Sequence, residues 1–194
     1  MTSAILLAGG ASRRMGEDKR FLTYKGQPLL ERAIDLLRPI AEELIVTVRK
    51  GDGALLPTQK GVRWMADRKA FAGPLTAIAH AIPHCRSEYI IVQACDMPQV
   101  TTEALQHLLN TARGHECDVC IPVVGAHRYE LPSVFAKGNE QRLMAYLESG
   151  KRSIRGYYKR HDVCVVSAEL SALQPRTDWV AVLSNWNDRA EVSC

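Results

Sequence analysis

The residues best suited to chemistry by type and spacing form one run, residues 7–19, directly after a short apolar segment. It begins Leu-Ala-Gly-Gly, and Arg13, Arg14 and Lys19 follow within it. Small residues let backbone N–H groups approach a phosphate closely, and the cations add positive charge to the same region. The glycine spacing fits neither the P-loop nor the dinucleotide G-x-G-x-x-G pattern. The run therefore predicts a phosphate-binding loop of another kind.

Two carboxylates follow apolar segments further along the chain. Asp96 comes just after Tyr89–Ala94, and Asp67 comes directly after Val62–Ala66. Because Mg²⁺ takes one or two carboxylates together with waters and substrate phosphates, Asp96 is a candidate magnesium ligand. Aspartates at such places also form turns or cap helices, and position alone leaves that alternative open.

The elements that would position these residues alternate between strand and helix. The apolar runs predict strands at Ala4–Ala8, Leu44–Val48, Val62–Ala66, Tyr89–Ala94, Val119–Val124, Ser133–Ala136, Val163–Val166 and Ala181–Leu183. Helical patterns cover Pro28–Glu43, Pro74–Ile82, Thr102–Ala112, Gln141–Leu147 and Ser153–Arg160. The alternation indicates an α/β fold with an open, mostly parallel sheet and helices on both faces. Ligands of such sheets bind beyond the carboxyl ends of the strands, where both aspartates and the first loop would meet.

Composition indicates one globular domain spanning residues 1–194. With 46% hydrophobic and 24% charged residues, the chain does not resemble disordered, coiled-coil or collagen sequences. Its apolar runs are too short to span a membrane, and no basic leader precedes the first one, so we expect a cytoplasmic protein. Cys117 and Cys120 form a C-x-x-C without a second ligand pair, which favours buried thiols over zinc.

The net charge of +4 favours anionic small molecules without establishing nucleic-acid binding. Basic residues are dense in two stretches, 13–20 and 151–160. No helix-turn-helix or aromatic RNA-binding motif is present, so we expect neither a nucleic-acid partner nor a membrane.

Four blocks resemble the molybdenum cofactor guanylyltransferase (MobA) family in order and spacing, and the match is strongest over residues 4–99. The blocks are the run at residues 7–19, Gly26-Gln27-Pro28-Leu29-Leu30, Gly73-Pro74-Leu75 and Cys95-Asp96-Met97-Pro98. The resemblance implies a single-domain, Rossmann-like fold of the nucleotide-diphospho-sugar-transferase type with a mixed sheet. Residues 1–99 would bind GTP and residues 100–194 the acceptor.

The resemblance also implies a reaction, the transfer of GMP from MgGTP to molybdenum-bound molybdopterin with release of pyrophosphate. Lys19 would contact the GTP phosphates, Asp67 would bind the nucleotide and Asp96 would ligate Mg²⁺. The guanine and ribose end would be lined by Leu7, Ala8, Gly9 and Gly10. The cationic side chain of Arg14, with that of Arg13, would stabilise the leaving pyrophosphate.

Some positions depart from the family pattern. Thr47 stands where the family often has Asn, and a final Thr-Pro is missing after Asn185 and Asn187. Acceptor contacts would come from Leu131–Ser133 or from residues 127–129 just upstream. In addition, Lys151 and Arg152 are candidates for the acceptor phosphate.

The sequence leaves other functions open. The same scaffold serves a molybdopterin cytidylyltransferase or a sugar-phosphate nucleotidyltransferase, and a non-catalytic carrier of molybdopterin or nucleotide is a further alternative. For the enzyme we expect a monomer or weak homo-oligomer with transient contacts to molybdoenzyme maturation proteins.

Overall fold

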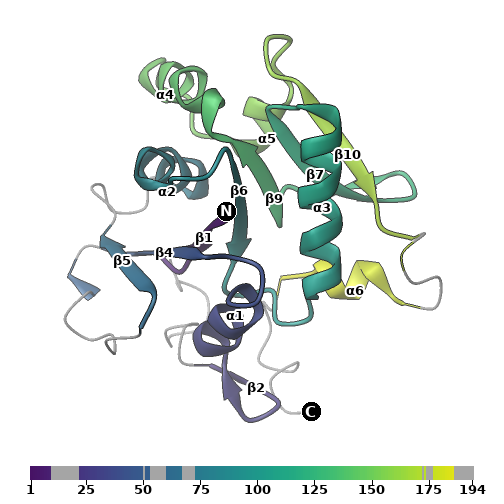
Figure 1. Ribbon diagram of the computed structural model, residues 1–194. Coiled ribbons are helices and arrows are strands. Elements are labelled where there is room, and N and C mark those ends of the chain that lie inside the picture. The colour runs from purple at the N-terminus through teal and green to yellow at the C-terminus, as the bar shows by residue number, and fades with distance from the viewer. Residues whose placement is uncertain are drawn as a thin grey trace.

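A computed structural model describes residues 1–9, 22–49, 51–52, 60–66, 73–171, 173 and 177–185. Within these residues, an eight-stranded mixed sheet runs through the molecule in the order β10-β7-β9-β6-β1-β4-β5, and β8 pairs with the end of β7 (Figure 1). Its strands are β1 (Ser3–Leu7), β4 (Glu43–Val48), β5 (Val62–Ala66), β6 (Tyr89–Ala94), β7 (Val119–Val124), β8 (His127–Arg128), β9 (Ser133–Ala136) and β10 (Val165–Glu169). β8 and β9 run antiparallel to their neighbours, and the other six strands are parallel.

Alternation along the central strand β1 explains why both faces of the sheet are covered. Ala4 and Leu6 enter one apolar cluster, whereas Ile5 enters the cluster on the other face. All three side chains are fully buried. Successive side chains of a strand point to opposite faces, so a strand with apolar side chains on both faces needs a helical layer on each side.

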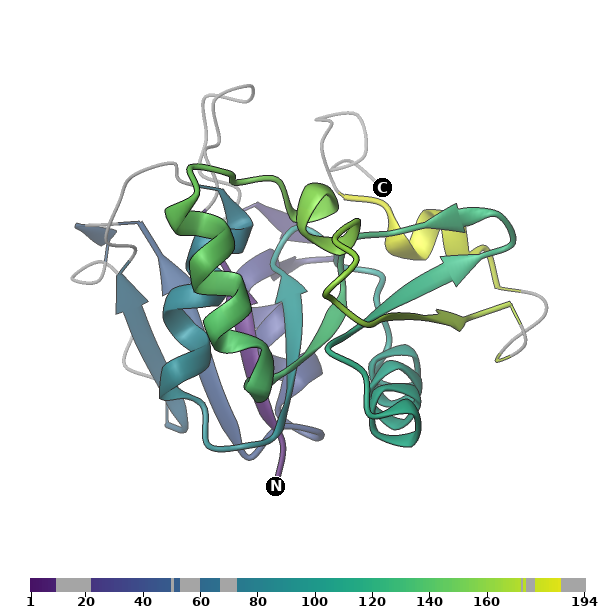
Figure 2. The same ribbon diagram turned by 90° about the horizontal axis from the view of Figure 1, so that it is seen from above.

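The helices supply these two layers. Figure 1 shows α1 (Leu29–Leu37) and α3 (Thr102–His115) on one side of the sheet, where α6 (Trp179–Leu183) joins the same apolar cluster. The second cluster includes residues of α2 (Pro74–Ala81), α4 (Glu140–Glu148) and α5 (Ile154–Tyr158). Figure 2 shows the sheet between the layers from above. Short 3₁₀ turns, η3 (Ile82–His84) and η4 (Lys137–Asn139), follow α2 and precede α4.

Most of the elements predicted from the pattern are present. The strands β5, β6, β7 and β9 have the predicted bounds. The first helix is shorter than predicted, because it ends at Leu37 rather than at Glu43. Pro39 follows closely and lacks the N–H that another helical turn would need. Glu43 instead begins β4.

The late part of the chain differs more. β10 begins at Val165, two residues after the predicted start. The predicted strand at Ala181–Leu183 was wrong, since these residues belong to helix α6. The Asp178 side chain caps this helix by accepting the Ala181 N–H at 3.1 Å. Trp179, Val182 and Leu183 are buried at helical spacing, and a three-residue apolar pattern does not distinguish that from a strand.

A small hairpin before α1 was not predicted. β2 (Thr23–Tyr24) pairs antiparallel with β3 (Gln27–Pro28). The two residues between them, Lys25 and Gly26, both have positive φ, at 50° and 79°. Two positive φ values are what a two-residue type I′ turn requires, and glycine adopts them without strain.

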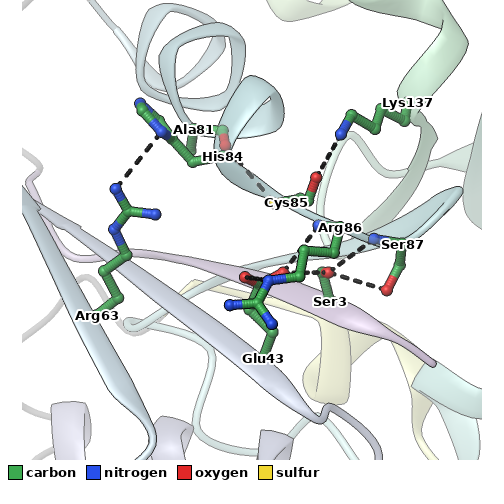
Figure 3. Close-up of polar contacts among 9 residues, drawn as sticks. All are labelled: Ser3, Glu43, Arg63, Ala81, His84, Cys85, Arg86, Ser87 and Lys137. Carbon is green, nitrogen blue, oxygen red and sulfur yellow. Dashed lines mark hydrogen bonds and ion pairs between the residues drawn. The ribbon is translucent and has the colours of Figure 1, made fainter.

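A polar network joins three strands of the sheet at the amino ends of its parallel strands (Figure 3). The Ser3 hydroxyl lies 2.7 Å from Glu43 Oε2 and 2.9 Å from Ser87 Oγ. The Arg86 backbone N–H donates to the same carboxylate oxygen at 2.9 Å. These contacts tie β1, β4 and the segment entering β6 together on the edge opposite their carboxyl ends. Within the described residues, no helix has the length and apolar character needed to cross a membrane.

Candidate functional site

The carboxyl ends of four neighbouring parallel strands, β6, β1, β4 and β5, meet at one edge of the sheet. Leu7, the last residue of β1, is paired with Thr47 of β4 on one side and with Ala94 of β6 on the other. This register puts the segments leaving β1 and β6 next to each other. In an open α/β sheet this is the edge at which ligands bind.

Backbone hydrogen bonds continue for one residue beyond β1 and β6. The N–H of Ala8 donates to a β4 carbonyl oxygen at 2.9 Å, and the N–H of Cys95 donates to the last carbonyl of β1 at 3.1 Å. The next residues along the chain are Gly9 and Asp96, both half-buried. The structure therefore brings the start of the glycine-rich run and the predicted magnesium ligand together, as the strand-end argument expected.

The buried side chain of Gln93 lies under the turn that carries Asp96 and bonds to backbone carbonyls on either side of it. Its Nε2 donates to the Ala94 carbonyl at 3.1 Å and lies 3.5 Å from the Met97 carbonyl. Its Oε1 has no hydrogen-bond partner among the described residues. Gln93 was not predicted, since a polar residue inside an apolar strand gives no sign of what it contacts.

Several predicted site residues lie outside the described residues, so their contacts stay predictions. They are Gly10, Arg13, Arg14, Lys19, Asp67 and Asn187. Of the others, Leu7 and Gly9 are half-buried, Ala8 is buried and Asn185 is exposed.

Thr47 lies inside β4 rather than beyond its end. Its side chain is 1% exposed, and its Oγ1 lies 3.5 Å from the Leu6 carbonyl oxygen. A hydroxyl so deeply buried within the sheet does not present itself to a ligand at the edge. The structure therefore gives Thr47 a packing position, in place of the polar contact that an Asn would offer.

The block at residues 73–75 begins α2 at the same edge. Gly73 has φ of 87°, which favours glycine, and Pro74 is the first residue of the helix. A Cβ on Gly73 would lie 4.0 Å from the Arg152 carbonyl oxygen. The start of α2 and the late basic stretch are therefore neighbours, although Gly73 and Arg152 are 79 positions apart in the sequence.

Most cations of that basic stretch already have partners. Arg152 donates to the Leu147 carbonyl at 2.5 Å, at the end of α4. Arg155 pairs with Glu130 at 2.5 Å. The Lys151 ammonium is exposed and lies 5.8 Å from the centre of the Tyr146 ring. Lys151 is thus the better placed of the two predicted anion-binding residues.

The segment leading into β9 reaches the same edge because β9 runs antiparallel to β6. Ser133 pairs with Val92, near the carboxyl end of β6. Helix α5 holds the preceding residues, since Tyr158 donates its hydroxyl proton to the Glu130 carbonyl at 3.1 Å. Burial raises the pKa of Tyr158 above its ordinary value, so this donor stays protonated at neutral pH.

The predicted burial of the C-x-x-C thiols is confirmed, since Cys117 and Cys120 are both at most 1% exposed. Among the described residues, no three His, Cys, Asp or Glu side chains lie together as a metal cage. A single half-buried carboxylate fits Mg²⁺, which binds through one or two carboxylates and the substrate phosphates. Asp96 is the described residue that would hold it.

Comparison with known proteins agrees with this geometry. The family described as MobA-like NTP transferase domain matches residues 4–166. A molybdenum cofactor guanylyltransferase of Shewanella sp. (strain MR-4) is 25% identical over 166 residues, covering 84% of this chain and 83% of the relative. A similar relative from Shewanella loihica is 26% identical over 165 residues, 84% of this chain and 83% of that protein.

Solved structures share the fold. Molybdopterin-guanine dinucleotide biosynthesis protein A from Archaeoglobus fulgidus superposes with a TM-score of 0.82 at 24% identity, covering 99% of this chain and 95% of that one. The 2-C-methyl-D-erythritol 4-phosphate cytidylyltransferase of Thermus thermophilus gives 0.72 at 15% identity, covering 97% and 94%. The mixed-sheet fold predicted from the motifs is confirmed. The chain belongs to the family of MobA-like NTP transferases and is an enzyme of the nucleotidyltransferase class.

Proposed function

We propose that this enzyme transfers GMP from MgGTP to molybdenum-bound molybdopterin in the cytoplasm, forming the guanine dinucleotide cofactor and pyrophosphate. The observation that supports it is that the segments carrying Gly9 and Asp96 leave the neighbouring strands β1 and β6 at the same edge of the sheet, in a chain of this family. Relatives named molybdenum cofactor guanylyltransferase support the choice of substrates.

The chemistry is an in-line displacement at the α-phosphorus of GTP. An oxygen of the acceptor's terminal phosphate forms the new P–O bond as the bond to the β-phosphate oxygen breaks, and pyrophosphate leaves. The attacking phosphate is already ionised at neutral pH, so no general base is required. What the protein must supply is alignment and neutralised charge.

The chain's own residues would divide this work. Asp96 would hold Mg²⁺, which when bound draws negative charge from the phosphates. Lys19 would contact the same phosphates, and Arg14 would stabilise the leaving pyrophosphate. The backbone of residues 7–10 would line the guanine and ribose.

On the acceptor side we assign the exposed ammonium of Lys151 to the molybdopterin phosphate. Arg152 would act indirectly, because its guanidinium is bonded to the end of α4. Lys151→Ala should weaken the apparent affinity for molybdopterin and leave that for GTP unchanged. An unchanged acceptor affinity would remove Lys151 from the site.

The decisive experiment follows pyrophosphate release from labelled GTP with molybdenum-bound molybdopterin as acceptor. Asp96→Asn should lower kcat/KM by about 10²–10³-fold, the size of effect seen when one electrostatic contact to a transition state is removed. Glu42→Gln serves as the control, because Glu42 is exposed and pairs with the amino terminus. Turnover by Asp96→Asn at the unmodified rate would refute the proposal.

Nucleotide choice and the carrier alternative need separate measurements. Thermal stabilisation by GTP, CTP, UTP or ATP with Mg²⁺ should be largest for GTP, because a ligand that binds only the folded state raises its stability. A shift with CTP alone would make the protein a cytidylyltransferase. Binding of both substrates without any pyrophosphate release would make it a carrier.

A further inference from the structure

The turn after β6 is connected by one side chain to a part of the molecule that is distant in sequence. Arg32, on the first turns of α1, donates its Nε–H to the Pro98 carbonyl oxygen at 2.6 Å. Pro98 lies two residues after Asp96, in the next turn of the segment that leads from β6 to α3. A charge-assisted hydrogen bond of this length is among the stronger polar contacts available to a backbone carbonyl.

The same guanidinium also contacts the hairpin that follows the glycine-rich run. It lies 5.0 Å from the centre of the Tyr24 ring, within the range of a cation–π contact. Tyr24 is 9% exposed. Leu29, the first residue of α1, donates its N–H to the carbonyl of Leu22, just before β2, at 2.8 Å, and this bond joins the open end of the hairpin to the helix. Arg32 therefore lies between the hairpin and the segment 95–100, and it contacts Tyr24 in the one and Pro98 in the other.

A pocket that is open to solvent lies beside the turn. A cavity of about 170 Å³ lies between α1 and the residues Met97, Pro98 and Val100. Inside the turn, the Val100 N–H reaches the Met97 carbonyl only at 3.4 Å, and Gln93 reaches it at 3.5 Å. The bond from Arg32 is much shorter than either, and the two residues that it joins both line this pocket.

We infer that Arg32 is a positioning residue for the metal-binding carboxylate, holding the segment 95–100 that carries Asp96 against the hairpin. The inference rests on the proposed function, in which Asp96 holds Mg²⁺. Residues that orient a metal ligand from behind commonly change metal affinity by 10–100-fold when they are removed. Arg32 contacts neither metal nor nucleotide in this role and acts through the backbone of Pro98.

Two substitutions separate the hydrogen bond from side-chain bulk. Arg32→Gln places an amide N–H at the same number of bonds from Cα as Nε, so the bond to the Pro98 carbonyl is retained. Arg32→Met places a methyl group there and has no donor. Arg38→Met is the matched control, since Arg38 is the exposed next residue after the same helix and pairs with Asp35.

The measurement is binding of Mn²⁺ to the full chain at saturating GTP without acceptor, followed by the EPR signal of free Mn²⁺. Arg32→Met should weaken Mn²⁺ binding by about tenfold, while Arg32→Gln and Arg38→Met stay close to the unmodified protein. GTP binding in EDTA should be alike in all four proteins. Amide exchange in residues 95–100 should be faster in Arg32→Met than in Arg32→Gln, a readout that needs no metal.

The outcomes separate the inference from the proposed function. If Arg32→Met binds Mn²⁺ as tightly as the unmodified protein, or if Arg32→Gln is as weak as Arg32→Met, the positioning role is refuted. An Asp96→Asn arm run in parallel tests the metal site itself. Unchanged Mn²⁺ binding in that arm refutes the proposed role of Asp96, whereas weakened binding there with no effect of Arg32 refutes only the inference.

Discussion

Individual basic side chains in residues 151–160 show how tertiary contacts divide residues of one type among different tasks. Arg152 donates to the end of α4, Arg155 pairs with Glu130, and Arg160 pairs with Asp162 at 2.5 Å. Their positive charges look equivalent in the sequence. Lys151 is exposed, and its ammonium lies over the Tyr146 ring rather than on a carboxylate or carbonyl oxygen, which is why the acceptor phosphate is assigned to it.

Burial likewise decides how Cys85 behaves. Its side chain is 1% exposed, and burial raises the pKa of the Cys85 thiol from 9.0 to about 12. The unfolded chain therefore loses this proton at lower pH than the folded protein. Between about pH 9 and pH 12 the folded state binds more protons, so its free energy of unfolding must fall as the pH rises.

The Cys85→Ser variant tests this titration. Serine keeps a donor for the Ala81 carbonyl, which the thiol contacts at 3.6 Å, and its hydroxyl does not titrate in this range. Urea unfolding measured between pH 8 and pH 11 should show a smaller decline for Cys85→Ser, by about one proton per molecule. Equal slopes for the two proteins would mean that Cys85 does not titrate on unfolding.

At the scale of elements, the β2–β3 hairpin depends on one glycine. Gly26 has φ of 79°, and nothing lies within 4 Å of where a Cβ would sit. Gly26→Ala should therefore destabilise the protein through backbone strain alone, by about 1–2 kcal/mol. The measurement is the urea midpoint of unfolding at unchanged m-value.

Gly114 gives the matched control, because it lies in α3 with equally open surroundings and an ordinary φ. Gly114→Ala should stabilise the protein by up to about 1 kcal/mol, because alanine loses less conformational freedom in a helix than glycine. The opposite signs of the two changes are the prediction. Destabilisation by both would contradict the assignment of strain to the hairpin turn.

At the scale of the whole molecule, the two edges of the sheet do different work. The amino edge carries the network of Ser3, Glu43 and Ser87 (Figure 3). The carboxyl edge carries the candidate site. A buried hydroxyl that bonds a carboxylate stabilises the fold, and its loss leaves the carboxylate without one partner. The site is separated from it by the length of the strands.

Ser3→Ala should therefore lower the free energy of unfolding by about 1–3 kcal/mol while kcat and KM for GTP stay unchanged below the melting transition. Ser149→Ala is the control, since its hydroxyl donates to a carbonyl at an exposed position. A change in KM for GTP in Ser3→Ala at full folding would show that the two edges are coupled.

The sequence pattern alone was sufficient to predict the strands whose carboxyl ends form the candidate site. Tyr89–Ala94 is buried almost throughout, and Val62–Ala66 is followed directly by an aspartate in the sequence. Both features can be recognised in the sequence without knowledge of the fold. From them followed the parallel sheet, the meeting of Gly9 and Asp96 at one edge, and the family. The helix at Trp179–Leu183 was missed because a short apolar run has no period of its own.

The sequence by itself determined which residues form the carboxyl edge, because the alternation of strands and helices implies parallel strands whose carboxyl ends lie at one edge of the sheet. Only the tertiary structure decided which side chains are free to act there. Arg32 bonds to Pro98, 66 positions away, and Glu130 pairs with Arg155, 25 positions away. Gln93 bonds to the carbonyl of its neighbour Ala94, and Thr47 is buried inside the sheet. Hydrogen bonds between distant segments depend on packing, and packing leaves no period in the sequence.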